Sequence, residues 1–409
     1  MNVLYCASEA TPFAASGGLG DVAGSLPRAI RNRKVACRVV LPLYGDMKQE
    51  YREKLTYVTN FSVPVGWRNQ YCGLFELTYD GVKYYFLDNE YYFKRTGLYG
   101  FYDDGERFAF FSRAILEMLF YIDFAPDIIH TNDWQTALVP VYLMLYYRHL
   151  EKYRNIKTVF TIHNIQYQGK YGMEILEDTL AIARHDAHIM EYDGCVNFMK
   201  GAIECCDKVT TVSPSYANEI LDPWYAHGLD GFLRQKQYKL CGILNGIDVK
   251  SYDPATDPNI VANFDANTFA ENKPKCKEEL QEIFGLNKWP VPVVAMVTRL
   301  VGHKGVDLVR HVGQEIINAG MQLVVLGTGE AQYEQYFNEL AARNAGCVGV
   351  KIAFVPSLAR KIYAGADMFL MPSKSEPCGL SQMVALRYGT VPIVRETGGL
   401  RDSIHDSGD

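Results

Sequence analysis

Short apolar runs alternate with amphipathic segments along the first half of the chain. Residues 2–8 and 36–41 are apolar runs of strand length, and Val22, Leu26 and Ile30 recur between them at helical spacing. Further strand-length runs lie at residues 126–130, 158–162, 208–213 and 241–244. This alternation of strands and helices predicts an α/β unit built on an open parallel sheet.

One stretch of this half has a different period. Residues 56–88 alternate apolar and polar positions, and Asp80-Gly81 within them is a hairpin turn signal. We therefore expect a local antiparallel insertion here. Helical spacing returns afterwards and predicts helices over residues 105–122 and 134–147.

A second series of strands and helices follows a polar stretch. Residues 249–290 contain several Pro, Asn and Asp, with one helix expected at about 275–284, and we interpret them as a domain link. Strands are predicted after it at residues 293–298, 322–326, 350–354, 368–371 and 391–394. The sequence thus predicts two doubly wound α/β domains, residues 1–248 and 249–409. The second domain looks cut short, because a helix has only just begun at Leu400 when the sequence stops.

Polar side chains gather where the predicted strands end. In the first domain these are Ser8, Glu9, Asn132, Asp133, His163, Asn164, Ser213, Asn245 and Asp248. In open α/β sheets the ligand crevice lies outside the carboxyl ends of the strands. The first strand is also followed by a glycine-rich loop, residues 14–21, which lets a phosphate approach backbone N–H groups closely. We therefore expect ligand binding at this edge.

The second domain offers cations and one carboxylate at the same kind of position. Arg299 and Lys304 follow a strand, and two fixed cations suit a diphosphate. Glu376 lies in a turn between the strand at 368–371 and a helix, where a helix N-terminus favours anions. Together they suit a ligand with hydroxyls and phosphates, such as a nucleotide sugar. Each feature alone also has a purely structural explanation: a solvated cationic rim, a first-turn acid, a glycine-rich helix entry, or a hydrogen-bonded core histidine at His163.

Composition narrows the function classes. Lys and Arg number 41 against 47 Asp and Glu, a net charge of −6 that argues against a nucleic-acid partner. Aromatic residues make up 13%, including 28 Tyr, which fits a protein that stacks sugars. Ten cysteines without a C-x-x-C pair indicate reduced thiols of a cytoplasmic protein. The first residues resemble a strand rather than a leader, and no apolar run approaches the ~20 residues of a membrane span.

The chain offers little for a metal. No D-x-D spacing occurs, so we expect protein cations, rather than a metal, to neutralise a diphosphate. His185 and His188 are three residues apart on a predicted helix and could form a metal pair, although no strand-end carboxylate accompanies them. We predict neither a metal nor another cofactor.

Seven stretches, in order along the whole chain, resemble bacterial glycogen synthase and plant starch synthase, the glycosyltransferases that extend α-1,4-glucan from ADP-glucose. The matching stretches are Ser16–Val22, His130–Trp134, Thr161–Gly169, Gly242–Asp248, Thr298–Leu300 with Lys304–Leu308, Glu376–Leu380 and Arg395–Leu400. The resemblance implies a GT-B fold, in which two Rossmann-like domains face each other across a cleft. It also implies transfer of glucose to the non-reducing end of a glucan with retention of configuration.

The resemblance assigns roles residue by residue. Arg299 and Lys304 would hold the diphosphate as it leaves, Glu376 would bond the glucose hydroxyls, and His163 would touch the donor sugar. Asp133 and Trp134 would line the acceptor side. The remaining substrate-binding positions that it implies are Ala15, Gly17, Gly18, Asn245, Cys378, Gly379, Leu380, Thr397 and Gly398.

One position departs from the family. Ala15 stands where the family normally has a Lys that contacts the ADP-glucose phosphates, and a lost charge-assisted contact weakens binding by roughly 1.5–3 kcal/mol. Two alternatives to an ADP-glucose-dependent synthase therefore stay open: an inactive or weakly active glucan-binding paralogue, and a UDP-glucose-using glucosyltransferase. A sugar phosphorylase, by contrast, needs pyridoxal phosphate on a lysine in a C-terminal segment that this sequence does not contain.

Overall fold

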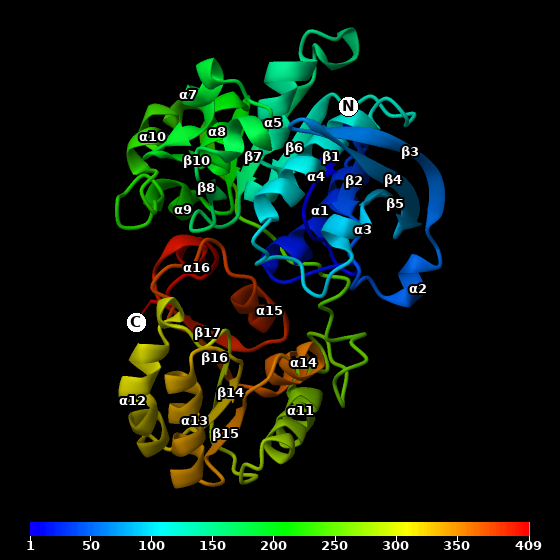
Figure 1. Ribbon diagram of the computed structural model, residues 1–409. Helices are drawn as coiled ribbons and strands as arrows, with labels where there is room; N and C mark the ends of the chain where they lie inside the picture. Colours follow the sequence, from blue (N-terminus) through cyan, green and yellow to red (C-terminus); the bar gives the residue numbers. More distant parts are fainter. Residues whose placement is uncertain (409) are drawn as a thin grey trace. The chain divides into compact units, whose positions relative to one another are not determined.

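The computed structural model describes residues 1–408 and divides into two compact units (Figure 1). Unit 1 comprises Met1–Val212 and Ala217–Ile243, and unit 2 comprises Ser213–Tyr216 and Leu244–Asp409. The domain division expected from sequence, after residue 248, lies five residues beyond the end of unit 1. Among residues 1–408, no helix combines the length and the apolar character needed to cross a bilayer.

Unit 1 is built on a nine-stranded sheet. From one edge to the other its strands are β12 (Leu240–Gly242), β11 (Lys208–Thr211), β7 (Lys157–Ile162), β6 (Ile128–Asn132), β1 (Asn2–Cys6), β2 (Ala36–Pro42), β5 (Val82–Asp88), β4 (Arg68–Tyr79) and β3 (Thr56–Val65). Neighbours from β12 to β5 are parallel, whereas β5, β4 and β3 are antiparallel. The predicted parallel sheet is confirmed.

The expected antiparallel insertion is confirmed, because β3, β4 and β5 pair in antiparallel fashion. The hairpin turn forms at Asp80-Gly81, where φ is 46° and 78°, values that favour Gly and Asp. However, β5 also pairs in parallel with β2, so residues 56–88 extend the main sheet. The unit's core there is apolar, with the ring of Phe13 packed edge-on against Tyr84 and Phe86.

The helices of unit 1 cover the sheet as the sequence pattern suggests, with one exception (Figure 1). The helix expected at 105–122 is α4 (Asp104–Met118), and α1 (Gly18–Asn32) follows the glycine loop. The helix expected at 134–147 is instead a 3-10 turn (Trp134–Thr136), α5 (Leu138–Tyr142) and a π turn (Leu143–Tyr147). All positions from Trp134 to Leu143 are buried, so the hydrophobic pattern carries no sign of the change from 3-10 to α-helix.

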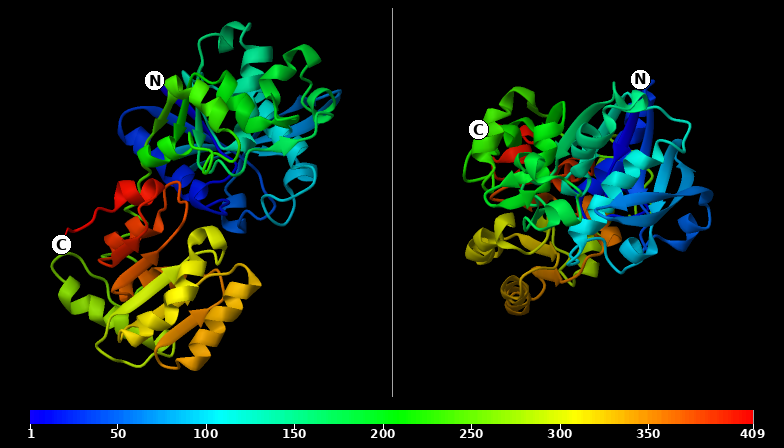
Figure 2. Two further views of the ribbon diagram at one scale, coloured as in Figure 1. Left: turned by 90° about the vertical axis from the view of Figure 1, so that its left-hand side faces the viewer. Right: turned by 45° about the horizontal axis from the view of Figure 1, so that its top comes forward.

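Unit 2 is a five-stranded parallel sheet with helices on both faces (Figure 2). Its strand order is β15 (Val348–Lys351), β14 (Gln322–Leu326), β13 (Val293–Val297), β16 (Met368–Met371) and β17 (Val391–Val394). One face packs on α11 (Phe269–Ile283), α14 (Pro356–Gly365) and α15 (Ser381–Arg387), and the other on α12 (Val306–Asn318) and α13 (Ala331–Arg343). The predicted doubly wound arrangement is confirmed, although the strand expected at 350–354 begins two residues earlier, at Val348.

Candidate functional site

In unit 1, the predicted residues Asp133 and His163 lie together at the carboxyl ends of β6 and β7. Asp133 has a φ of 54°, and its carboxylate accepts hydrogen bonds from the backbone N–H of His163 at 2.7 Å and of Asn164 at 3.4 Å. Burial raises the pKa of Asp133 to about 7 despite these two donors. The carboxylate therefore ties the ends of two neighbouring strands and is poised near neutrality.

The imidazole of His163 is held in one tautomer. Its Nε2 lies 2.9 Å from Oδ1 of Asn132, whose amide nitrogen donates to the carbonyl of Cys6. Because that amide is oriented by the Cys6 contact, Nε2 carries the proton. Burial, assisted by His130, lowers the pKa of His163 to about 3, so the ring is a neutral donor at pH 7.

The glycine loop is anchored by Glu9, a residue that sequence reasoning placed at a strand end but not in the site. Glu9 is 3% exposed, and its carboxylate accepts hydrogen bonds from the backbone N–H groups of Ser16 and Gly20. The loop thus folds back over the end of β1, leaving Ala15, Gly17 and Gly18 exposed at the start of α1. Burial raises the pKa of Glu9 to about 6.

Trp134 lines a pocket of about 420 Å³ together with Gln166, Tyr167, Lys170 and His227. The indole itself is 9% exposed and packs edge-on against Phe108, with ring centroids 5.1 Å apart. Gly169 lies against the indole, because a Cβ at that residue would come within 2.7 Å of the ring. The pocket's polar side chains beside a partly exposed aromatic edge suit hydroxyl-bearing ligands.

In unit 2, the predicted residues Lys304 and Glu376 form an ion pair. Lys304 Nζ lies 2.6 Å from Glu376 Oε2, which also accepts from the hydroxyl of Ser373 at 3.0 Å. Glu376 is 7% exposed, and Lys304 is the last residue of a short 3-10 turn (Gly302–Lys304) after β13. The turn that carries Glu376 thus meets the strand end that carries Lys304, as the sequence predicts for a single site.

Arg299 joins this pair around His303, which sequence reasoning did not single out. The pKa of His303 is lowered by burial and then by the charges of Lys304 and Arg299, while Glu376 opposes them. All three predicted charged residues therefore act on one imidazole. A histidine flanked by Arg299 and Lys304 was visible in the sequence, but its burial was not.

The other predicted residues of unit 2 form the wall around Glu376. The backbone N–H of Gly399 donates to the carbonyl of Glu376 at 3.0 Å, which ties the turn at 373–380 to the start of α16 (Gly398–Ser403). Asn245 bonds the thiol of Cys378, whose pKa burial raises to about 12. Gly379 precedes Leu380 and has a φ of 70°, and Gly398 follows the buried Thr397 and has a φ of 45°. Glycine adopts such positive φ values readily.

Asp133 with His163 in unit 1 and Lys304 with Glu376 in unit 2 are thus brought together, but Ser213, Asn245 and Asp248, which were expected in the first domain, belong to unit 2. Within residues 1–408, no three His, Cys, Asp or Glu side chains are grouped so that they could hold a metal ion. Of the two histidines considered as a metal pair, His185 has its Nε2 3.2 Å from Oδ2 of Asp186, and His188 has its Nδ1 3.1 Å from the carbonyl oxygen of His185. The prediction of a metal-independent protein stays a prediction.

Two family models match the chain. Residues 2–235 match the model described as starch synthase catalytic domain, and residues 278–409 match glycosyl transferases group 1. The chain is 54% identical over 407 residues to a glycogen synthase of Geobacillus thermodenitrificans, covering 99% of this chain and 84% of that protein. It is 50% identical over 409 residues to a glycogen synthase of Clostridium acetobutylicum, covering 99% of this chain and 85% of that protein.

A solved structure matches over the same extent. The catalytic domain of starch synthase IV from Arabidopsis thaliana, bound to ADP and acarbose, is similar with a TM-score of 0.92 and 34% sequence identity. The match covers 100% of this chain and 85% of that one.

Proposed function

The chain belongs to the glycogen synthase and starch synthase family of glycosyltransferases, and from that premise we propose that it transfers glucose from ADP-glucose to the non-reducing end of an α-1,4-glucan. It has the GT-B fold and is a hexosyltransferase. The configuration at the anomeric carbon is retained, as the family implies. The observation that carries the site assignment is the 2.6 Å ion pair of Lys304 with Glu376, beside which Arg299 and Lys304 both lower the pKa of His303.

The cations of unit 2 stabilise the leaving group. As the glycosidic bond to phosphate breaks, negative charge grows on the nucleoside diphosphate, and fixed cations are worth most where charge develops. Arg299 can grip phosphate oxygens bidentately, whereas Lys304 acts as a point charge. Burial, reinforced by the charges of Lys304 and Arg299, lowers the pKa of His303 and favours its neutral form, which can donate a hydrogen bond without adding a third charge.

Glu376 serves the sugar and keeps Lys304 in place until the donor binds. Its carboxylate is fixed by Ser373 and Lys304, and its backbone carbonyl by Gly399. A carboxylate held this rigidly can accept hydrogen bonds from glucose hydroxyls with little reorganisation. When the donor binds, Lys304 leaves the carboxylate of Glu376 and pairs with the diphosphate oxygens instead.

The residues of unit 1 provide neutral or weakly charged partners for sugars. His163 donates from Nε2 to Asn132, which orients the ring and leaves Nδ1 to accept a hydrogen bond from a hydroxyl of the donor glucose. Asp133 and Trp134 contact the glucan acceptor. The exposed loop at Gly17 and Gly18 offers backbone N–H groups to the phosphates.

Incorporation of labelled glucose into glycogen tests this proposal and its alternatives. The purified chain is incubated with glycogen and either ADP-[¹⁴C]glucose or UDP-[¹⁴C]glucose. We expect incorporation from ADP-glucose, at a rate that is about 10²–10³-fold lower in Arg299→Ala. Preferential incorporation from UDP-glucose would overturn the donor assignment. Glycogen binding without incorporation from either donor would instead support the glucan-binding paralogue.

A further inference from the structure

The pocket of about 420 Å³ that Trp134 lines continues from the strand ends of the candidate site in unit 1. Trp134 directly follows Asp133 at the end of β6, and residues 166–170, all of which line the pocket, come shortly after His163 at the end of β7. His227 lines it from the segment before α10 (Asp230–Gln235). Because two loops pass from the candidate site into the pocket, a chain-like ligand that ends at Asp133 and His163 can extend into it.

The wall of this pocket is held in place by one buried glutamine. Nε2 of Gln168 donates to the carbonyl oxygens of Ile165 at 3.0 Å and His227 at 3.1 Å, and its Oε1 accepts from Nδ2 of the buried Asn197. His227 has a φ of 49°, which is uncommon for a residue other than glycine. Such a conformation persists where the surroundings impose it, and it is frequent at binding sites. The pocket is therefore formed before a ligand arrives.

The polar side chains that line this rigid wall are themselves free. Four of them are exposed, namely Gln166, Tyr167, Lys170 and His227. Within residues 1–408, none of these four side chains forms a hydrogen bond or an ion pair. The ring of Tyr167 is 49% exposed. Side chains that stabilise nothing in the protein, on a backbone that is fixed, suit the binding of a ligand.

The pocket carries little charge. Burial, and then the charge of Lys170, lower the pKa of His227 below its ordinary value, so the imidazole is neutral at pH 7. Among the described residues that line the pocket, Lys170 is thus the one that is ionised at this pH. Neutral hydrogen-bonding groups beside an open aromatic face suit a sugar, whose hydroxyls and C–H faces match them, better than they suit a phosphate.

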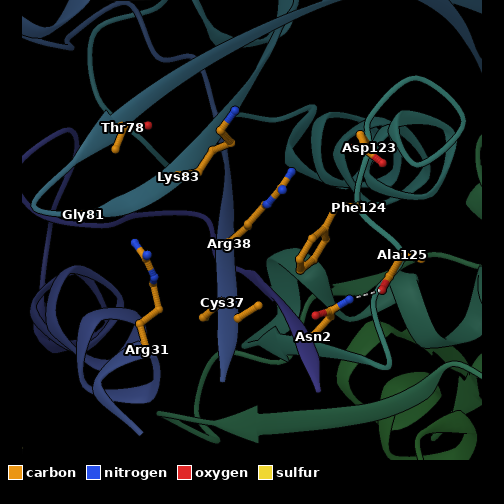
Figure 3. Close-up of a pocket in the computed structure, with 11 residues that line it drawn as sticks. Asn2, Arg31, Cys37, Arg38, Thr78, Gly81, Lys83, Asp123, Phe124 and Ala125 are labelled. Carbon is orange, nitrogen blue, oxygen red and sulfur yellow. Dashed lines mark hydrogen bonds between the residues drawn. The ribbon is translucent and has the colours of Figure 1, made fainter. Parts of the chain in front are cut away.

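A pocket of about 580 Å³ at the amino ends of β1, β2 and β5 has a different character (Figure 3). Arg31 and Arg38 lie on opposite sides of β2, and their side chains point apart. Nη1 of Arg38 donates to the hydroxyl of Tyr85. Nζ of Lys83 lies 2.8 Å from a carboxylate oxygen of Glu76. The cations of this pocket diverge or bond within the protein, so its lining residues provide control positions.

We propose, building on the proposed transfer reaction, that the pocket beside Trp134 is a further acceptor subsite, which binds the glucan at units away from its reacting end. The ring of Tyr167 stacks on a glucose unit, and Gln166, Lys170 and His227 hydrogen-bond its hydroxyls. The volume of the pocket falls in the range of small-molecule sites, so it holds a short stretch of the chain. Tyr167 and His227 thereby set how tightly long acceptors bind.

Titration calorimetry of the full chain with maltoheptaose, in the absence of a donor, tests the subsite. Tyr167→Ala is expected to weaken binding about tenfold, whereas Tyr167→Phe keeps the ring and should bind within about twofold of the unaltered chain. His227→Asn loses the imidazole, tolerates the positive φ and should weaken binding about fivefold. Tyr238→Ala, at a tyrosine that is 77% exposed outside the pocket, and Asp123→Asn, in the pocket of Figure 3, are controls without effect.

Steady-state kinetics separate the subsite from the transfer reaction. Tyr167→Ala should raise the KM for maltoheptaose about tenfold and leave the KM for ADP-glucose unchanged, a split that a general loss of structure would not produce. The subsite is overturned if the unaltered chain shows no saturable binding of maltoheptaose, if Tyr167→Ala binds as tightly as the unaltered chain, or if Tyr238→Ala weakens binding equally. Intact binding differences without glucose incorporation would overturn the transfer reaction and support the subsite.

Discussion

The strand ends of the two sheets differ in how much charge they carry: ionisable side chains are largely neutral in unit 1 and charged in unit 2. In unit 1, burial opposes charge: it raises the pKa of Glu9 and Asp133 and lowers that of His130 and His163. In unit 2, Arg299 is exposed and Lys304 is half-buried beside Glu376, so charges persist. The same strand–turn–helix geometry thus serves two tasks, and the depth of burial decides which. One edge supplies neutral hydrogen bonds, and the other supplies fixed charge.

Removing fixed charge from unit 2 should have the largest effect. Arg299→Ala is expected to lower kcat about 10²–10³-fold, because it deletes a cation aimed at the charge that develops on the diphosphate. Steady-state kinetics with ADP-glucose measure this. Lys288→Ala, which removes an exposed lysine paired with Glu282, is the control and should leave kcat unchanged. A loss of less than about threefold in Arg299→Ala would contradict the assignment of charge chemistry to unit 2.

Neutralising Asp133, a partly buried acid of unit 1, should raise the free energy of unfolding instead. The pKa of Asp133 is about 7 in the fold and about 3.9 when unfolded, so between those values the native state keeps a proton that the unfolded chain has lost. Stability therefore falls as pH rises from about 4 to about 7. Asp133→Asn keeps both acceptor contacts and should be more stable than the unaltered chain at pH 8, by up to ~4 kcal/mol.

Denaturant unfolding at pH 4 and pH 8 measures the effect of Asp133→Asn. Asp193→Asn is a matched control, since Asp193 also has a positive φ, 57°, but is exposed. The control should keep the pH dependence of the unaltered chain. If the stability of Asp133→Asn depended on pH as strongly as that of the unaltered chain, the proposed contrast between the strand ends of unit 1 and unit 2 would be wrong.

Placing a cation in the glycine loop should give unit 1 a fixed positive charge of the kind found in unit 2. Ala15 is exposed, so Ala15→Lys fits without repacking and is expected to strengthen ADP-glucose binding by roughly 1.5–3 kcal/mol. A tenfold or larger fall in KM is the predicted readout. Ala15→Met has similar length without the charge and should not change KM. Equal effects of the two substitutions would show that side-chain contact, rather than charge, is responsible.

The smallest expected effect concerns the loop anchor. Glu9→Gln replaces a charge-assisted acceptor of the Ser16 and Gly20 N–H groups by a neutral one, a loss of about 1 kcal/mol that should raise the donor KM about fivefold at pH 8. Because the pKa of Glu9 is about 6, the unaltered chain is itself protonated at pH 5, and the two KM values should converge there. Glu50→Gln, at an exposed position, is the control. A constant KM ratio across this range would refute the anchoring role.

Much of the fold is readable from the sequence because its strands are short apolar runs bounded by turn residues. Met368–Met371 and Val391–Val394 were predicted to the residue for this reason. The pairing of β5 with β2 was not, since a local pattern does not reveal which strand lies alongside. The breaks between residues 134 and 147 were missed because apolar residues face every direction there.

The candidate site was predicted as a set of residues rather than as a geometry. Strand ends pointed to Asp133, His163, Arg299 and Lys304, because parallel strands deliver their last residues to one edge. The anchoring role of Glu9 depends on a loop that folds back on its own strand, which spacing alone does not show. The contact between Lys304 and Glu376 spans 72 residues of sequence and likewise has no local signal.

The Lys304–Glu376 ion pair has a kinetic consequence. A cation and an anion 2.6 Å apart cancel each other at a distance, so a nucleotide sugar diffusing toward unit 2 is attracted mainly by Arg299. Long-range attraction from about one charge is weak at physiological ionic strength, where the Debye length is about 8 Å. Donor capture should therefore depend little on salt, and the full positive charge acts only after the ligand has arrived and separated the pair.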